Sequence, residues 1–352
     1  MIITVVSFLC VIVVLIITHE LGHFITAKAS GVKVEEFGLG FPPRLFSIRR
    51  GETLYSLNAV LLGGFTKMAG EEDPKVPGSL ASKGTGTRLL VLSAGSLMNL
   101  LLPLLLFSIA FMIPDNQVIG QVMIEEVDPD SPAARAGIEP GDTFLSVNEK
   151  PVNNTNDLYR YIQLNLGKEI TILVKHSDST TETVQVIPRW EPPEGQGAVG
   201  VLTTTVEPTI VKQSEPFWRA IPSGAGACIE TFVLFKNGII SMIIGATPVA
   251  VTGPVGIAQL TGEVAQAGIS PLLEFAAFLS INLAIINLFP LPALDGGRIV
   301  FVLLEGVRRG KRISPKAESL IHTIGFALLM AAFLAITYQD IIRIISGDSL
   351  IP

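Results

Sequence analysis

The sequence predicts a multi-pass α-helical membrane protein with four transmembrane helices, a membrane-associated β-hairpin and one inserted β-rich domain. Three observations support this fold class. Hydrophobic residues make up 49% of the 352 residues, charged residues make up 16%, and the mean hydropathy is +0.54. An average soluble protein carries about 25% charged residues. The apolar residues also gather in long runs, whereas one central segment is polar and rich in turn residues.

Four apolar runs are long enough to cross a bilayer, since about 20 helical residues span a hydrocarbon core roughly 30 Å thick. In chain order they cover about residues 1–27, Leu89–Ile113, Leu272–Leu291 and Ile321–Tyr338. The first run lacks a basic start and a small-residue cleavage site, so we interpret it as a retained span rather than a signal peptide.

The loops that join these spans differ in charge. Basic residues dominate the loop between the first two spans and the loop between the last two. The long region between the second and third spans begins instead with acids, namely Asp115, Glu125, Glu126, Asp128 and Asp130. Because basic loops stay in the cytoplasm, both termini and the central region are expected outside. The net charge of −6 argues against a nucleic-acid partner.

The central segment is predicted to form a small β-rich domain. Three β-rich runs, TFLSV, EITILVK and ETVQVIP, alternate with turns such as EPGD and HSDST, and a helix is expected over about Thr155–Leu166. Further on, Pro216–Gly245 is expected to be an amphipathic helix at the outer interface, with Phe217 and Trp218 as aromatic anchors. The chain thus divides into an N-terminal membrane core (1–113), the β-rich domain (114–210), an interfacial linker (211–270) and a C-terminal membrane core (271–352).

A β-hairpin is predicted in the first cytoplasmic loop, over Arg44–Met68. Apolar residues alternate with polar ones on both sides of Arg50-Gly51-Glu52, which indicates a turn there. The second strand contains the apolar, glycine-rich run LLGGF. Non-helical backbone at membrane depth is tolerated only where protein or a water-filled cavity satisfies its polar groups. A sheet edge beside an active site would be such a place.

Two histidines and a glutamate end the first apolar run, in ITHELGHFI. The motif H-E-x-x-H, from His19 to His23, puts two imidazoles on one face of a helix, where they can hold one Zn²⁺. Glu20 is then close enough to take a proton from a water that the metal activates. Ionisable groups at membrane depth are costly, so we favour a metal site over histidines that merely bond neighbouring helices.

A catalytic zinc ion usually has three protein ligands and one open position, so a third ligand must lie elsewhere in the chain. Glu35 and Glu36 are candidates, but a short polar stretch could simply be solvated. The stronger candidate is Asp295, in INLFPLPALDGGRIV, where prolines break the third span near the cytoplasmic side. The alternative role of Asp295 is to cap a helix that starts at Gly296.

Five stretches in this order, HELGH, GFP in GLGFPPRLF, GGFTKMAGE, GPVGIA and NLFPLPALDGG, resemble the site-2 protease family of intramembrane zinc metalloproteases. The chain looks most similar to the bacterial, PDZ-containing branch, whose members cleave membrane-anchored anti-sigma factors at the cytoplasmic membrane. The resemblance implies zinc ligands at His19, His23 and Asp295, with Glu20 as the general base. The charges of the loops place His23 and Asp295 near the cytoplasmic side, where they could meet.

The resemblance further implies how a substrate is held. Asn287 would orient the substrate or stabilise the oxyanion. The Arg44–Met68 hairpin would be a re-entrant loop whose edge pairs with an unwound substrate. Three hairpin residues are expected at that edge: Gly63, Gly64 and Phe65. Asn99, in the second span, either lines the cavity, as the resemblance favours, or bonds across helices. His322, at the start of the fourth span, is expected to pack rather than to bind metal, and His176 to be solvated.

The β-rich domain resembles a PDZ domain through SPAARAGIEPGD, Ser131–Asp142, followed by FLSVNEKPV. The tetrapeptide GLGF, a carboxylate-binding loop in many PDZ domains, also occurs at Gly38–Phe41. It lies in the cytoplasmic loop, far from the PDZ-like region, so we reject that interpretation. The peptide-binding loop itself is not evident from the sequence. Some relatives carry two such domains, whereas this chain has room for one.

The expected function is therefore an intramembrane zinc endopeptidase. Its partners would be membrane lipid and a transmembrane protein substrate, already trimmed outside by another protease. Two alternatives stay open, a membrane-anchored PDZ adaptor with a structural metal and a zinc enzyme acting on a non-peptide substrate. The intact glutamate of H-E-x-x-H argues against the adaptor, because a structural metal needs no general base.

Overall fold

The computed structural model describes residues 2–71, 73–247, 252–311 and 313–346. By its internal contacts the chain forms two compact units. The first comprises Met1–Ala110 and Val251–Pro352, and the second comprises Phe111–Ala250. The metal-binding motif and the candidate third ligand both belong to the first unit, and the β-rich segment belongs to the second.

Five helices in the described ranges are long and apolar enough to cross a membrane: α1 (Ile2–Ala29), α2 (Thr85–Met112), α5 (Phe217–Ile243), α7 (Ile269–Leu288) and α9 (Pro315–Ser346). Four of them coincide with the predicted spans. The fifth, α5, falls in the segment expected to be an interfacial helix, and it also meets these criteria of length and hydropathy. Polar residues interrupt its sequence, and its hydropathy is the lowest of the five, 1.4 against 1.9 to 2.8.

Glycines let α1 and α2 approach closely. A Cβ added at Gly22 of α1 would collide with the backbone carbonyl of Ala94 on α2, and one added at Gly95 would collide with both imidazoles of the motif. Small residues at such crossings let helix backbones pack without large side chains between them. The crossing therefore brings the backbone of α2 directly against the metal-binding face of α1.

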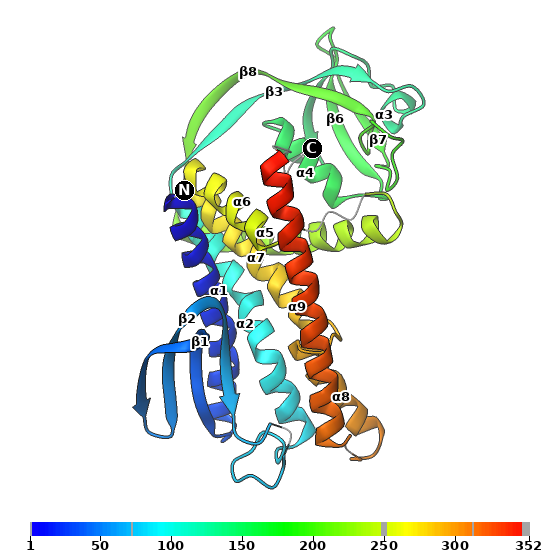
Figure 1. Ribbon diagram of the computed structural model, residues 1–352. Helices are drawn as coiled ribbons and strands as arrows, with labels where there is room; N and C mark the ends of the chain where they lie inside the picture. The colour runs from blue at the N-terminus through cyan, green and yellow to red at the C-terminus, as the bar shows by residue number, and fades with distance from the viewer. Residues whose placement is uncertain (1, 72, 248–251, 312, 347–352) are drawn as a thin grey trace. The chain divides into compact units, whose positions relative to one another are not determined.

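A two-stranded sheet, formed by β1 (Val34–Arg50) and β2 (Thr53–Met68), lies against the lower half of α1 in Figure 1. The turn falls at Gly51, as predicted, but the sheet begins at Val34 rather than at Arg44. Both strands fold back, so that residues 36–39 pair with 54–57 on one side, and residues 34–39 pair with 64–68 on the other. Gly64–Met68 is consequently an edge segment of a curled, four-segment sheet.

Aromatic side chains fix this sheet to α1. The ring centroid of Phe24, on α1, lies 5.3 Å from that of Phe37 and 6.0 Å from that of Tyr55. Phe37 pairs with both Tyr55 and Thr66 in the sheet register. These contacts hold the edge segment beside the helical turn that carries the metal-binding motif.

The C-terminal part of the first unit contains α6 (Pro254–Ala267), α7, α8 (Asp295–Val307) and α9. The helix α7 ends at Leu288, and Pro290 and Pro292 follow in an irregular connection to α8. Gly325 of α9 packs against Pro292 so closely that a Cβ would collide with it. Nearer its end, α9 is held by Asp340, whose carboxylate accepts a hydrogen bond of 2.8 Å from the backbone of Gly256, at the start of α6.

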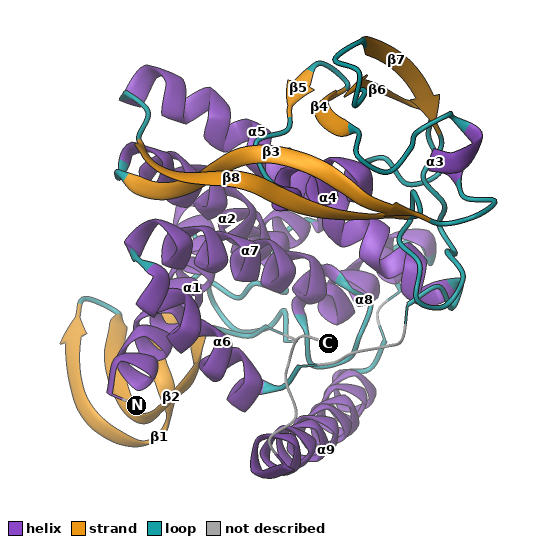
Figure 2. Ribbon diagram, turned by 90° about the horizontal axis from the view of Figure 1, so that it is seen from above, coloured by secondary structure: helices purple, strands orange, loops and turns teal. Residues whose placement is uncertain are grey.

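The second unit is a β-rich domain, as predicted. Its six-stranded sheet has the order β7-β6-β4-β3-β8, and β5 pairs with β4. The strands are β3 (Asp115–Val127), β4 (Thr143–Val147), β5 (Lys150–Pro151), β6 (Ile170–Lys175), β7 (Thr181–Val186) and β8 (Val201–Gln213). Figure 2 shows β3 and β8 as one long, curved pair. Alternating buried residues of β6, such as Ile170, Ile172 and Val174, contribute to its core.

Helices α3 (Pro132–Arg135) and α4 (Thr155–Leu164) complete this domain, with Ser131 and Asn154 as their N-caps. The predicted helix Thr155–Leu166 is thus confirmed to within two residues. Polar contacts tie α4 and β5 to α5. The carboxylate of Glu230, on α5, forms ion pairs with Arg160 at 2.6 Å and with Lys150 at 2.5 Å. Asn237 donates a hydrogen bond of 2.7 Å to the carbonyl of Gln163. Residues 248–251 of the predicted linker lie outside the described residues.

Candidate metal centre and its cavity

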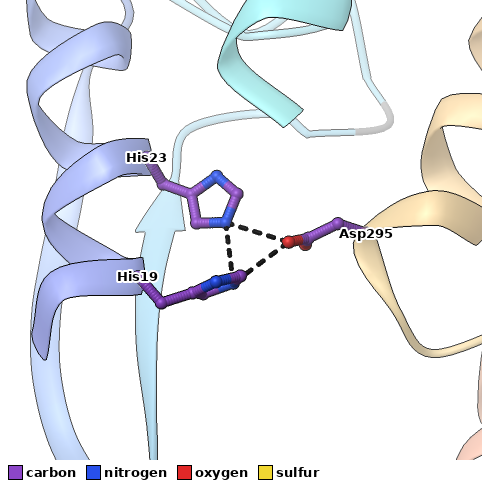
Figure 3. A group of neighbouring side chains, drawn as sticks. All are labelled: His19, His23 and Asp295. Atoms are coloured by element: carbon purple, nitrogen blue, oxygen red, sulfur yellow. Dashed lines mark hydrogen bonds and ion pairs between the residues drawn. The ribbon is translucent and has the colours of Figure 1, made fainter. Parts of the chain in front are cut away.

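The three predicted metal ligands meet in the first unit, two from α1 and one from the first residue of α8 (Figure 3). The Nε2 atoms of His19 and His23 lie 3.0 and 3.1 Å from Asp295 Oδ2, and 3.2 Å from each other. His23 is 6% exposed. His23 and Asp295, which are 272 residues apart in the sequence, therefore lie within hydrogen-bonding distance.

A backbone contact sets the orientation of the His23 ring. Its Nδ1 donates a hydrogen bond of 2.8 Å to the carbonyl of Val91 on α2. A neutral imidazole that donates through Nδ1 keeps a lone pair on Nε2, which is the atom facing Asp295 and His19. Metal-binding histidines are typically oriented by such a bond. The α1–α2 crossing therefore fixes the ring that it buries.

The connection before α8 directs Asp295 into the centre. The N-cap position of α8 is Leu294, and Asp295 is the first helical residue, with its carboxylate against the two histidines. The alternative role of Asp295 as an N-cap for a helix starting at Gly296 is therefore wrong. Gly296 and Gly297 lie against the backbone carbonyls of Leu288 and Leu291, where a Cβ would collide. Only glycines allow this tight fold at the end of α7.

The geometry fits a zinc ion. Zn²⁺ at about 2.0–2.2 Å from tetrahedral ligands would separate the ligand atoms by roughly 3.3–3.6 Å. The three separations of 3.0, 3.1 and 3.2 Å are within a few tenths of an ångström of that range. Two imidazole nitrogens and one carboxylate oxygen form a common catalytic zinc set with a fourth position left for water or substrate. In the part of the chain that the structure describes, no other His, Cys, Asp and Glu side chains form such a group.

The candidate general base lies between the metal-binding residues and the edge segment of the sheet. Glu20 Oε2 accepts a hydrogen bond of 2.7 Å from the hydroxyl of Thr66 on β2. Gly64, two residues earlier, lies so near that its Cβ would stand 3.0 Å from Glu20 Cγ. The edge segment therefore lies so close to Glu20 that a side chain larger than that of glycine would not fit at position 64.

A cavity of about 860 Å³ opens at this centre. The three ligands and Glu20 line it, as do the predicted substrate-binding residues Asn287, Gly63, Gly64 and Phe65. The whole segment Gly63–Met68 contributes to one wall, and α9 contributes Ser319, His322, Thr323 and Phe326. Four of the five predicted substrate-binding residues are thus brought together with the metal centre.

Asn99 is not among the residues that line this cavity. Its side chain is fully buried, and its amide has no hydrogen-bond partner among the described residues. A hydrogen bond between helices does occur at this position, but it involves the backbone of Asn99: the hydroxyl of Ser280, on α7, donates to the carbonyl of Asn99, on α2, at 2.7 Å. The other candidate ligands, Glu35 and Glu36, pair in the sheet with Lys67 at 3.0 Å and with Arg44 at 2.7 Å.

Sequence reasoning missed several residues of this site. Gly95 and Val91 act through close approach and a backbone carbonyl, which no motif specifies. Thr66 lies within GGFTKM, but its role depends on how the sheet packs. His322 is also more than a packing residue, because its Nδ1 accepts a hydrogen bond of 2.9 Å from the backbone of Ala293, two residues before Asp295. The left-handed backbone of Ala293, at φ 76°, is the signal that this loop is held under constraint.

An H-E-x-x-H helix completed by a distant aspartate, within apolar helices long enough to span a bilayer, defines a membrane-embedded zinc metalloprotease. Comparison with known proteins agrees. The chain belongs to peptidase family M50, the site-2 protease family, whose model matches residues 7–332. The two alternatives, a membrane adaptor and an enzyme acting on a non-peptide substrate, do not agree with membership of a peptidase family.

Relatives of known name span nearly the whole chain. A putative zinc metalloprotease of Clostridium perfringens is 38% identical over 93% of this chain and 95% of its own length. The regulator of sigma-W protease RasP of Bacillus subtilis is 27% identical over 97% of this chain and 99% of its own. Among solved structures, the PDZ domain of an SdrC-like protein of Listeria monocytogenes matches 23% of this chain and 85% of that domain, with 20% identity and a TM-score of 0.21.

Proposed function

We propose that this protein is an intramembrane endopeptidase that cleaves transmembrane helices of membrane-anchored regulators, such as anti-sigma factors. The observation that carries this proposal is the position of the Gly64–Met68 edge segment, which walls the same cavity as Glu20 and the three ligands. A relative named for regulating sigma-W supports the substrate class. The substrate would be a membrane protein already shortened outside by another protease.

The side chains of the cavity divide the chemistry among them. His19, His23 and Asp295 would hold the metal. When bound, zinc supplies Lewis-acid polarisation of the scissile carbonyl and lowers the pKa of a water to about 7. Glu20 takes the proton from the attacking water and later gives it to the leaving amine. Asn287 lines the same cavity, and its amide would orient the substrate backbone.

The unwound substrate would pair with the edge segment as an added strand, and this pairing would hold the scissile peptide bond at the metal centre. Backbone amides of a transmembrane helix are already hydrogen-bonded, so the substrate must unwind before a peptide bond reaches the metal. Main-chain hydrogen bonds to a sheet edge offset those that unwinding breaks. Gly63 and Gly64 line this wall, and their missing side chains leave room for Phe41 against Gly63 and for Ile16 and Glu20 against Gly64.

The β-rich domain would bind the new C-terminus that the earlier cleavage creates. Within the second unit, a groove of about 290 Å³ is lined by apolar residues of α4, such as Leu158 and Ile162, and by Gly200 and Val201 at the start of β8. An extended peptide could add beside β8 there. Binding of a peptide with a free carboxylate but not of its amidated form tests this role, and equal binding of both would contradict it.

The proposed location is the bacterial cytoplasmic membrane, with the β-rich domain outside and the active site toward the cytoplasm. In this arrangement α5 lies in the outer interface. Its middle residue Glu230 pairs with Lys150 and Arg160 of the β-rich domain, which favours a surface position over a span. The outward side chains Trp218 and Ile229 are 63% and 67% exposed. In a background without Cys10 and Cys228, Lys236→Cys, at an exposed polar position of α5, should react with a membrane-impermeant maleimide added outside; complete protection in intact cells would contradict the interfacial position.

Trapping tests the main proposal. The Glu20→Gln protein should retain zinc, because the three ligands remain, but should cleave a model transmembrane helix at least about 100-fold more slowly, since general bases contribute 10²–10⁴-fold. The same protein should co-purify with uncleaved membrane partners. Wild-type protein with full zinc content that leaves every tested membrane helix intact would contradict the proposed activity.

A further inference from the structure

Thr66 joins the substrate-binding edge to the general base by a single hydrogen bond. Its hydroxyl lies 2.7 Å from Glu20 Oε2 and 3.1 Å from the backbone carbonyl of Glu20. A hydroxyl carries one proton, and the shorter contact to the charged acceptor is the stronger of the two. The threonine side chain is 9% exposed, so water competes little for this bond.

The bond restrains one oxygen of a carboxylate that has few other restraints. Glu20 has three rotatable side-chain bonds, and among the described residues its side chain makes a hydrogen bond only with Thr66. With Oε2 held, Oε1 is the oxygen available to face the metal centre. A general base must lie within hydrogen-bonding reach of the proton that it abstracts, and misplacement by about 1 Å can cost 10²-fold in rate.

The position of Thr66 along β2 holds its hydroxyl in place relative to α1. Thr66 pairs with Phe37 in the sheet, and Phe37 packs on Phe24, one helical turn after Glu20. Gly64, on the same edge, already touches Ile16 and Glu20 on α1. Thr66 is therefore fixed to α1 from both sides, which makes it a rigid donor rather than a mobile one.

We propose that Thr66 is a positioning residue for the general base, and that it makes the edge segment a part of the proton-transfer apparatus as well as a surface for the substrate. The inference rests on the proposed function, because it assigns a role within that reaction. It distinguishes Thr66 from its neighbours on the edge, whose proposed role is to contact the substrate. The hydroxyl acts on Glu20, not on the peptide.

The test compares variants that keep or remove the hydroxyl. Thr66→Val has nearly the same shape without a donor, and Thr66→Ser keeps the donor. We expect Thr66→Val to lower kcat about 10- to 100-fold with KM changed less than about 2-fold, and Thr66→Ser to stay within about 3-fold of wild type. Zinc content should be unchanged in both.

A matched control separates catalysis from folding. Thr53 lies on the same strand, is fully buried, and donates a hydrogen bond of 2.8 Å to the carbonyl of Val34. It does not line the cavity. Thr53→Val therefore removes an equivalent hydrogen bond from the same sheet, and it should lower thermal stability without a selective loss of kcat.

Binding to the inactive enzyme gives a second readout. In the Glu20→Gln background, adding Thr66→Val should leave the affinity for a labelled substrate helix unchanged, because Thr66 acts through residue 20. Weaker binding would assign the hydroxyl to the substrate and overturn the proposal, as would wild-type kcat in Thr66→Val. Failure of the wild-type protein to cleave the helix would instead refute the proposed function, so the two failures are distinguishable.

Discussion

The close approach of α2 to the metal-binding histidines yields a quantitative prediction for Gly95→Ala. An added Cβ would lie 2.7 and 2.8 Å from His19 Cε1 and Nε2, and nearer still to His23 Nε2. Ordinary contacts begin at 3.4 Å, so the ring of His19 must retreat by about 0.6–0.7 Å and that of His23 by more. If the backbone of α2 retreated instead, it would break the hydrogen bond of 2.8 Å between His23 Nδ1 and the carbonyl of Val91, which orients the other ligand ring.

Metal sites tolerate ligand displacements of only about 0.2 Å, so both histidines would leave their positions for zinc. We expect zinc affinity to fall at least about 100-fold, which corresponds to roughly 2.8 kcal/mol at 1.4 kcal/mol per tenfold. Competition with a chromophoric chelator on the detergent-solubilised protein measures this loss. Gly86→Ala is the matched control, because Gly86 is on the same helix and a Cβ there meets nothing within 4 Å. Equal zinc affinity in Gly95→Ala and Gly86→Ala would refute the packing argument.

Two further predictions concern the remaining histidines. His322→Phe removes the acceptor for the backbone of Ala293 and should lower zinc affinity by roughly 10-fold, as loss of outer-shell partners does, whereas His322→Asn keeps an acceptor and should lose less; chelator competition compares them. In the β-rich domain, the carboxylate of Asp142 accepts a hydrogen bond of 3.0 Å from His176 Nδ1 and raises the pKa of His176 above its ordinary 6.5, with Glu182 adding to the effect. A raised pKa stabilises the fold while the imidazole is charged, so protection of β4 and β6 amides in the full-length protein, corrected for intrinsic exchange, should decline as pH rises through the folded-state pKa. His176→Gln should abolish that decline, and an identical decline in the variant would show that another group titrates.

Local sequence patterns were sufficient to predict the metal-binding helix and several strands of the β-rich domain. Histidines four residues apart predict a shared face, and TFLSV became β4 with the same bounds. For His176 the polar turn indicates a solvated side chain, but it does not indicate the carboxylate partners that both ring nitrogens have. The sheet at Val34 also escaped prediction. Its first strand contains GLGFPP, whose glycines and prolines suggest a loop, and only pairing with two distant segments makes it a strand.

The third ligand required information beyond local pattern. Asp295 is placed beside His23 by contacts of Gly296 and Gly297 with the end of α7, and by the irregular loop that His322 holds. None of these contacts leaves a periodic signal. The charges of the loops and the resemblance to a family could indicate Asp295, but they could not exclude its use as a helix cap. That required the position of its carboxylate.

The edge segment also bears on how the enzyme avoids unwanted partners. An unpaired strand edge is ordinarily a hazard, because it can template association with any exposed strand of another molecule. Here Gly64–Met68 lies in the wall of a cavity, beside α1, rather than on an open surface. An intact helix is about 10–12 Å across and has no free backbone groups to exchange. On the proposed function, selectivity would arise from the conformational stability of the substrate helix: segments that unwind readily would be cleaved, while stable helices in the same bilayer would not.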